Sequence, residues 1–94
     1  MSEQSHGDSE QERLARVQAV KRTHEEALMA RANVVGVGVG LVRRRGAATG
    51  DVGIVVMVSR KVPASQLAAA DLVPRELEGV PVDVQAVGEI RAHS

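Results

Sequence analysis

The histidines, serines and aspartates of this sequence are the groups that could carry out metal-binding or hydrolytic chemistry. His6, His24 and His93 lie far apart, without the i, i+4 or fixed loop spacing that a zinc site needs, so we expect no metal. His24, with Glu25 beside it, is expected to be a partly buried helix residue. A triad built on His24 would need a serine and an aspartate from Ser59, Ser65, Asp51, Asp71 and Asp83. Neither serine lies in a nucleophile motif such as G-x-S-x-G, so no catalytic site is expected.

Two basic segments could bind an anion: the run Arg43, Arg44 and Arg45, and the pair Arg60 and Lys61. If they face each other across a hairpin, they form a basic patch that could contact phosphates. The chain has no Phe, Tyr or Trp, so it lacks the aromatic platforms on which single-strand binders stack bases. We therefore favour the competing interpretation, a solvated strand end whose charges discourage edge-to-edge aggregation.

The stretch "NVVGVGVGLVRRR" has glycine at every second position, at Gly36, Gly38 and Gly40. As a strand it has one face without side chains, which a helix, another copy of the chain or a ligand could approach closely. A dinucleotide-binding fingerprint would need a tight turn and a helix directly after the glycines, whereas "LVRRR" continues the strand. We therefore expect no cofactor, and close packing by a helix or a partner chain.

The chain has 94 residues, no aromatic side chain and seventeen valines, and its net charge is zero. Residues 1–12 carry four acidic and no basic side chains, so the remainder carries a net charge of +4. This excess is too small to pull strongly on nucleic acid or anionic lipid. Because such a small, valine-built core is marginal on its own, we expect the protein to be a homo-oligomer.

The sequence also predicts a compartment. The absence of cysteine fits a reducing cytosol. The polar, acidic N-terminus lacks the basic and apolar regions of a signal peptide, and no apolar run reaches the roughly 20 residues that span a bilayer. We therefore expect a soluble, cytoplasmic protein without a membrane partner.

A long amphipathic helix is expected over residues 9–32, after a disordered tail at residues 1–8. Ser9 and Glu12 form a capping box, and the residues that follow are good helix formers. The apolar stripe expected to face the sheet or a partner consists of Leu14, Val17, Val20, Ala27 and Leu28.

Three strands are expected after this helix, at residues 34–44, 52–61 and 80–87, with a loop at 45–51 and a short helix over residues 64–71. The order α-β-β-α-β predicts a single α+β domain over residues 9–94, in which residues 33–90 form a β-β-α-β unit. A split crossover would make the third strand parallel to the second and place it on the free side of the first. The predicted sheet is three-stranded and mainly antiparallel, with order 2-1-3 and the glycine strand at its centre.

Three blocks carry a family resemblance: "NVVGVGVG" at residues 33–40, "TGDVGIVVMVSRKVP" at 49–63 and "LVPRELEGVPVDVQAVGEI" at 72–90. In order and spacing they resemble a non-catalytic segment upstream of the catalytic domain in bacterial and plant trypsin-like serine peptidases. Two features depart from that pattern: Leu41 stands where an aromatic residue is common, and the chain ends where the peptidase domain would begin. The resemblance implies a leading module that stands alone here, without peptidase activity.

The sequence therefore favours a stand-alone, non-catalytic interaction or assembly module that self-associates and could bind a peptidase or another protein carrying the same module. Its candidate contact residues are Gly36, Gly38, Gly40, Leu14, Val17 and Leu28. The alternative is a nucleic-acid-binding accessory protein that uses Arg43, Arg44, Arg45, Arg60 and Lys61. A third interpretation, a peptidase-related enzyme, is disfavoured because the catalytic residues are missing.

Overall fold

The computed structural model describes residues 2–45 and 47–88 and has a small α+β fold. Its long helix is α1 (Ser2–Met29). Four strands follow: β1 (Val34–Arg44), β2 (Ala47–Val58), β3 (Glu76–Leu77) and β4 (Val80–Ala86). Two short 3-10 helices, η1 (Ala64–Gln66) and η2 (Ala69–Asp71), lie in the connection between β2 and β3. The predicted α+β class is confirmed.

The strand order is β1-β2-β4-β3, so the predicted three-stranded order 2-1-3 is wrong. As expected, β4 runs parallel to β2, but it pairs with β2 itself and not with β1. Strand β2 takes an inner position because Ile54, Val56 and Val58 are almost completely buried and need neighbours on both sides. The glycine strand β1 therefore lies at an edge of the sheet, and the short β3 lies at the other edge.

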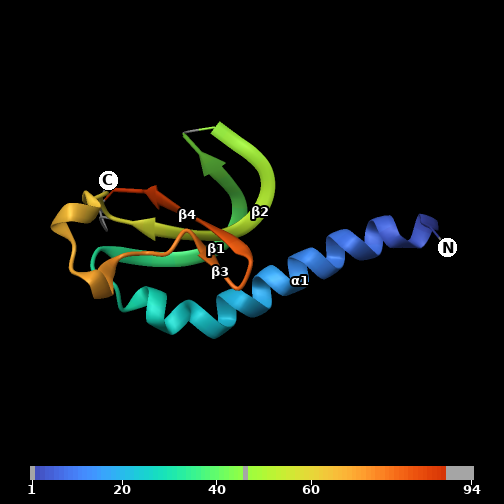
Figure 1. Ribbon diagram of the computed structural model, residues 1–94, viewed down its shortest axis with the longest axis horizontal. Helices are drawn as coiled ribbons and strands as arrows, with labels where there is room; N and C mark the ends of the chain where they lie inside the picture. The colour runs from blue at the N-terminus through green and yellow to red at the C-terminus, as the bar shows by residue number, and fades with distance from the viewer. Residues whose placement is uncertain (1, 46, 89–94) are drawn as a thin grey trace, which may run out of the picture.

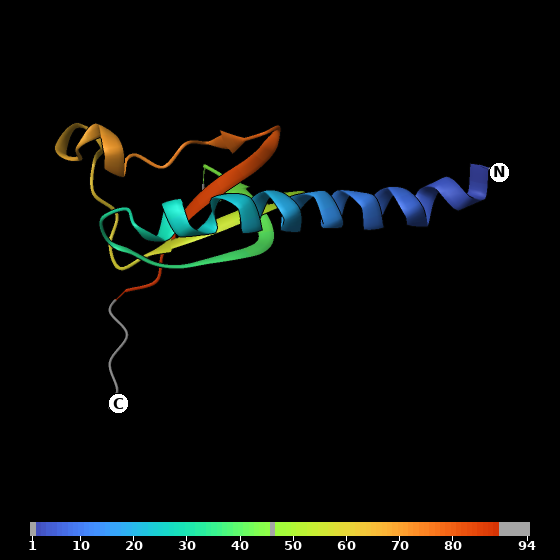
Figure 2. The same ribbon diagram turned by 90° about the horizontal axis from the view of Figure 1, so that it is seen from below.

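Helix α1 covers one face of the sheet, here called the inner face, while its N-terminal part projects beyond the strands (Figures 1 and 2). The core between helix and sheet consists of Val17, Val20, Leu28, Ile54, Val56, Val58, Val80 and Val82. Val37 and Val39 of β1 pack against this cluster. Because side chains alternate along a strand, Gly36, Gly38 and Gly40 lie on the opposite face, here called the outer face.

Helix α1 begins at Ser2 and so includes residues 2–8, for which the sequence predicts a tail; the disorder of that tail stays a prediction. Ser9 lies inside the helix and does not cap it. Extending an existing helix avoids the cost of nucleation, and Gly7 is the one residue of this segment that strongly disfavours it. The predicted helix end near Ala32 is close to the observed one, since α1 ends at Met29 and Asn33 adopts a left-handed conformation with φ 70°.

The hairpin of β1 and β2 is longer than predicted. Strand β2 begins at Ala47, so most of the expected loop 45–51 is strand, and β2 ends at Val58 and not at Lys61. The sequence hides this extension because residues 47–51 do not alternate between apolar and polar. The Thr49 hydroxyl stabilises it by donating to the carbonyl of Val42, over 2.8 Å.

The connection from β2 to β4 contains η1 and η2 and not the predicted continuous helix over 64–71. A helix this short is marginal by itself, and tertiary contacts decide its form. Here the Arg31 guanidinium donates to the carbonyls of Ala70, at 2.6 Å, and Leu72, at 2.7 Å. The Ala32 amide donates to the Asp71 carboxylate at 2.9 Å, so the residues that follow α1 hold this connection in place.

Candidate functional site: the free sheet edge and the curled hairpin

The glycine stripe faces side chains of the neighbouring strand and not a helix or another backbone segment. A Cβ built at Gly38 would lie 3.7 Å from Cε of Met57, which is an ordinary contact. At Gly36 it would lie 3.0 Å from the same flexible atom, and at Gly40 it would lie 3.4 Å from Cγ2 of Val55. The expectation that a helix of this chain packs on the stripe is therefore wrong, because α1 lies on the other face. The β2 side chains lean into the space that the glycines leave.

Strand β1 is a long free edge without charged residues over Val34–Val42. Two of its large apolar side chains are exposed: Val35 by 42% and Leu41 by 53%. Both stand next to register shifts, which lie between Val34 and Gly36 and between Leu41 and Arg43. Natural edge strands are commonly protected by charges, prolines or a covering element, and here the charges begin only at Arg43.

The far end of the hairpin curls away from α1 and back over the outer face (Figure 1). The bend occurs where β2 has Gly53, since a Cβ at that position would collide with the Pro81 carbonyl oxygen and with Cγ2 of Val42. Val42 is 1% exposed and forms the apolar contact beneath the curl. No signal in the sequence singles out Gly53, although it makes the closest contact among the described glycines. It lies outside the regular stripe, and its nearest neighbours come from both β4 and β1.

Asp83 fixes the curled hairpin to β4. This carboxylate is 8% exposed and accepts hydrogen bonds from the backbone amide of Arg43, at 2.8 Å, and from the side chain of Gln85, at 3.0 Å. Burial raises the pKa of Asp83, but these two hydrogen bonds and the charges of Arg43 and Lys61 outweigh it, so the pKa lies below its ordinary value. The Asp83 carboxylate is therefore ionised at neutral pH, and its hydrogen bond to the Arg43 amide holds β1 on β4.

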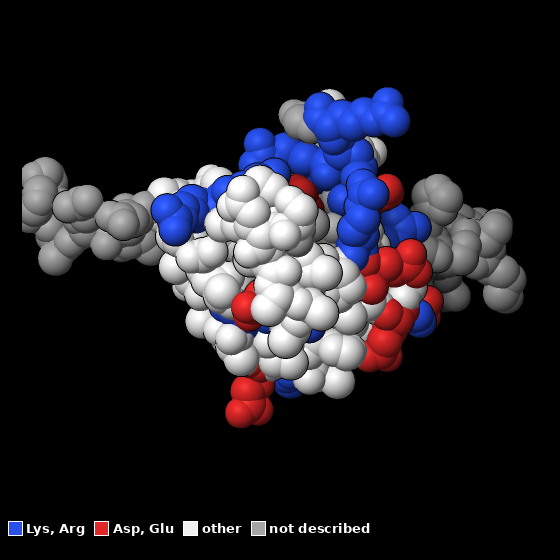
Figure 3. Space-filling model, turned by 60° about the vertical axis from the view of Figure 1, so that its left-hand side comes forward, with Lys and Arg blue, Asp and Glu red and all other residues white. Residues whose placement is uncertain are grey.

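The curl brings four of the five predicted patch residues together. Arg43, Arg45 and Lys61 line a surface groove of about 410 Å³ above β4. A neighbouring groove of about 230 Å³ adds Arg44, whose guanidinium donates to the carbonyl of Val82 at 3.2 Å, and also Arg75. Figure 3 shows Lys and Arg side chains gathered along one margin of a largely uncharged surface. The expected geometry is wrong, because the partners of Arg43 and Arg44 across the hairpin are Ala48 and Ala47.

Of the predicted helix contacts, Val17 and Leu28 are buried in the core, whereas Leu14 is 42% exposed. Leu14 precedes Val17, the first buried side chain among those described in α1, so the helical stripe extends beyond the buried core. Ala27, also on the predicted stripe, is exposed.

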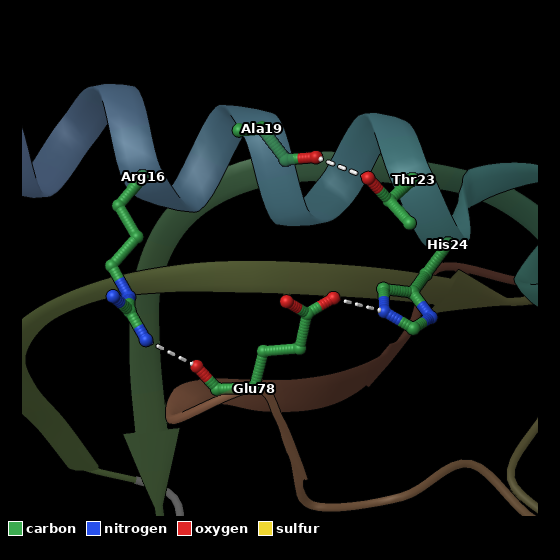
Figure 4. A network of polar contacts seen from close by, with 5 residues as sticks. All are labelled: Arg16, Ala19, Thr23, His24 and Glu78. Atoms are coloured by element: carbon green, nitrogen blue, oxygen red, sulfur yellow. Dashed lines mark hydrogen bonds and ion pairs between the residues drawn. The ribbon is translucent and has the colours of Figure 1, made fainter.

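His24 joins α1 to the turn between β3 and β4, and the predicted partly buried helix position is confirmed. Its Nε2 lies 2.7 Å from Oε2 of Glu78, and Arg16 donates to the Glu78 carbonyl at 2.6 Å (Figure 4). Glu78 and Gly79 both have positive φ values, 52° and 83°, as the two central residues of a type I′ turn do.

The candidate triad partners do not meet in this arrangement. Within the described residues, the side chains of Ser59 and Ser65 form no hydrogen bond with His24. No group of three or more His, Asp or Glu side chains in residues 2–45 and 47–88 could hold a metal ion. Over the same part of the chain, no helix has both the length and the hydrophobicity needed to cross a bilayer. His6 lies in α1, and His93 falls outside the described residues.

No protein-family model matches the chain, and no curated protein matches it significantly.

Proposed function

We propose that this protein is a non-catalytic assembly module in which the free edge of β1 pairs with β1 of a second copy. The observation that carries the proposal is the edge itself, with its uncharged stretch over Val34–Val42 and its exposed Val35 and Leu41. An uncharged edge of this length is a template for strand addition. A cytosolic location is part of the proposal, since the sequence has no cysteine.

A two-fold antiparallel pairing centred on Gly38 fits the exposed residues. In this register Gly36 lies opposite Gly40 of the second copy, and Val35 lies opposite Leu41 of the second copy. The two exposed apolar side chains of the edge then cover each other. Such an interface is isologous and closes at a dimer, so it does not grow into a fibre.

Helix α1 leaves room for this pairing. Arg16 and His24 contact the β3–β4 turn, whereas Lys21 and Glu25 lie on the side of the helix next to Val39 of β1. Lys21 and Glu25 line a polar hollow between α1 and β1, together with Gln18, Arg22 and Val39. In the dimer the helices of both copies would flank the paired strands. Lys21 and Glu25, which form an ion pair at 2.8 Å within one chain, would face the second helix.

The test is the mass in solution by light scattering at micromolar concentrations. We expect a dimer for the natural sequence and a folded monomer for Val35→Lys and Leu41→Lys, because each places a charge at an exposed edge position. The matched control is Val87→Lys, a side chain of similar exposure, 46%, that follows β4. A monomer throughout the micromolar range, or a dimer that survives both substitutions, would contradict edge pairing.

The same edge could accept β1 of another protein with the same module, as the family resemblance suggests for a peptidase partner. Copies of the Val34–Leu41 strand in a different chain offer the same backbone groups and the same exposed side chains. Co-purification that Leu41→Lys abolishes and Val87→Lys preserves would support this heterotypic form.

A second candidate function, nucleic-acid binding, is favoured by the gathering of Arg43, Arg45 and Lys61 in one groove. Phosphate contacts release counterions, so binding would weaken steeply as salt rises. Retention on nucleic acid that falls with salt and is reduced by Arg43→Gln together with Arg45→Gln would support it. If the natural sequence and the double variant are retained equally, the groove of Arg43 and Arg45 is not a nucleic-acid-binding site.

A further inference from the structure

A hollow of about 230 Å³, here called the crossover hollow, lies between the sheet and the connection from β2 to β4. Its walls are mainly apolar and come from Val58, Val62, Leu67, Leu72, Val73 and Val84. This volume exceeds the roughly 150 Å³ of an apolar cavity that holds one benzene ring. The hollow is thus large enough for a single ring or a branched aliphatic group.

The crossover hollow is preformed because hydrogen bonds from Arg31 and Ala32 hold the connection between β2 and β4 that covers it. Arg31 bonds to the carbonyls of Ala70 and Leu72, and Asp71 accepts the amide of Ala32. These bonds fix the connection to the residues that follow α1 and so oppose its collapse onto Val84. The chain has no aromatic side chain to fill the space, and an empty apolar cavity costs stability.

The mouth of the hollow carries a positive charge. Arg60 and Lys61 both line it and are both exposed, and neither takes part in the ion pairs formed among the described residues. The one acidic side chain at the lining, Asp71, is engaged by the Ala32 amide. An arginine guanidinium offers a planar pair of donors that matches a carboxylate.

We propose that the crossover hollow binds a small amphipathic monocarboxylate, with its apolar body against Val58 and Val84 and its carboxylate at Arg60 and Lys61. A nucleotide does not fit, because the hollow is smaller than the usual range for such ligands and offers no ring for a base to stack on. An ammonium head is disfavoured because it would meet two cations.

The experiment compares three probes with the same ring and different heads: phenylacetate, phenylacetamide and phenethylamine. Each is titrated into the isotope-labelled full chain and followed by amide chemical shifts. We expect saturable shifts around Val58, Leu72 and Val84 with phenylacetate, weaker ones with the amide, and none with the amine. Equal responses to all three, no response to phenylacetate, or shifts confined to β1 or to the groove of Arg43 and Arg45 would overturn the proposal.

Two substitutions and a control separate the contributions of charge and shape. Arg60→Gln should weaken phenylacetate binding by about tenfold, since a hydrogen bond to a charged group is worth roughly that factor. Leu72→Phe, at a side chain that is 39% exposed, should fill the hollow and abolish binding. Arg75→Gln, an exposed cation outside the hollow, should leave the affinity unchanged. Unchanged affinity in both Arg60→Gln and Leu72→Phe would overturn the site.

The dimer and the hollow are independent. The monomeric variant Leu41→Lys should bind phenylacetate as the natural sequence does, because Leu41 lies on the free edge and does not line the hollow. Loss of binding in this variant would show that the hollow needs the second copy and would overturn the proposal as stated.

Discussion

At Gly53, strand β2 passes so close to the Pro81 carbonyl and to Val42 that no side chain fits. We therefore expect Gly53→Ala to lower the free energy of unfolding by about 1–3 kcal/mol, the usual cost of overpacking. Gly38→Ala is the matched control: its methyl group would make an ordinary contact with Met57, and its smaller backbone entropy loss favours the strand. Urea unfolding of both variants measures the difference. Equal stability of the two variants would mean that the hairpin does not need its curl.

Asp83 should make stability depend on pH. Its pKa is lowered in the folded protein, so its contribution is complete above the unfolded pKa of about 3.9 and is lost as the pH falls through the lower folded value. Asp83→Asn should be less stable by about 1–3 kcal/mol at pH 7, and this gap should narrow below about pH 4. Urea midpoints across this range test it, with Asp51→Asn, an exposed carboxylate of the same hairpin, as the control. If the stability difference between the natural sequence and Asp83→Asn stays constant with pH, the charge of Asp83 does not contribute to stability.

Among the elements, those specified by local periodicity could be predicted from the sequence: the course of α1 through Val17 and Leu28, the strand from Val34 to Arg44, and the last strand from Val80. The neighbours of each strand could not. The alternation of Gly36, Gly38 and Gly40 reveals a bare face. Which strand takes an inner position depends instead on the pairing of Ile54 with Val82 and of Val56 with Val84. The basic residues could be recognised from the sequence by their type. That they lie close together could not be predicted, because it depends on the bend at Gly53, which follows from the contact of Gly53 with Pro81.

Helix α1 offers a matched test of which part of it holds the fold. Leu28 is 1% exposed, so Leu28→Ala should cost about 2–5 kcal/mol through lost burial and the remaining cavity. Leu14 is 42% exposed on the projecting part, so Leu14→Ala should change stability by no more than about 0.5 kcal/mol. Thermal or urea unfolding measures both. A large effect at Leu14 would show that the projecting part of the helix packs against a partner.

At the scale of the whole molecule, the core is thin for a chain of this size. It is built from valines with one leucine and one isoleucine. If the β1 edges of two copies pair, folding and association are coupled, because the folded dimer is favoured by mass action.

The melting temperature of the natural sequence should then rise with protein concentration. That of Leu41→Lys should be independent of concentration and should equal the low-concentration limit of the natural sequence, since Leu41 contributes nothing to the core of one chain. Val87→Lys should keep the concentration dependence. Differential scanning calorimetry over a hundredfold range of concentration tests all three. If the melting temperature of the natural sequence does not change over this range, a single chain accounts for the stability. The uncharged edge of β1 would then bind a different partner.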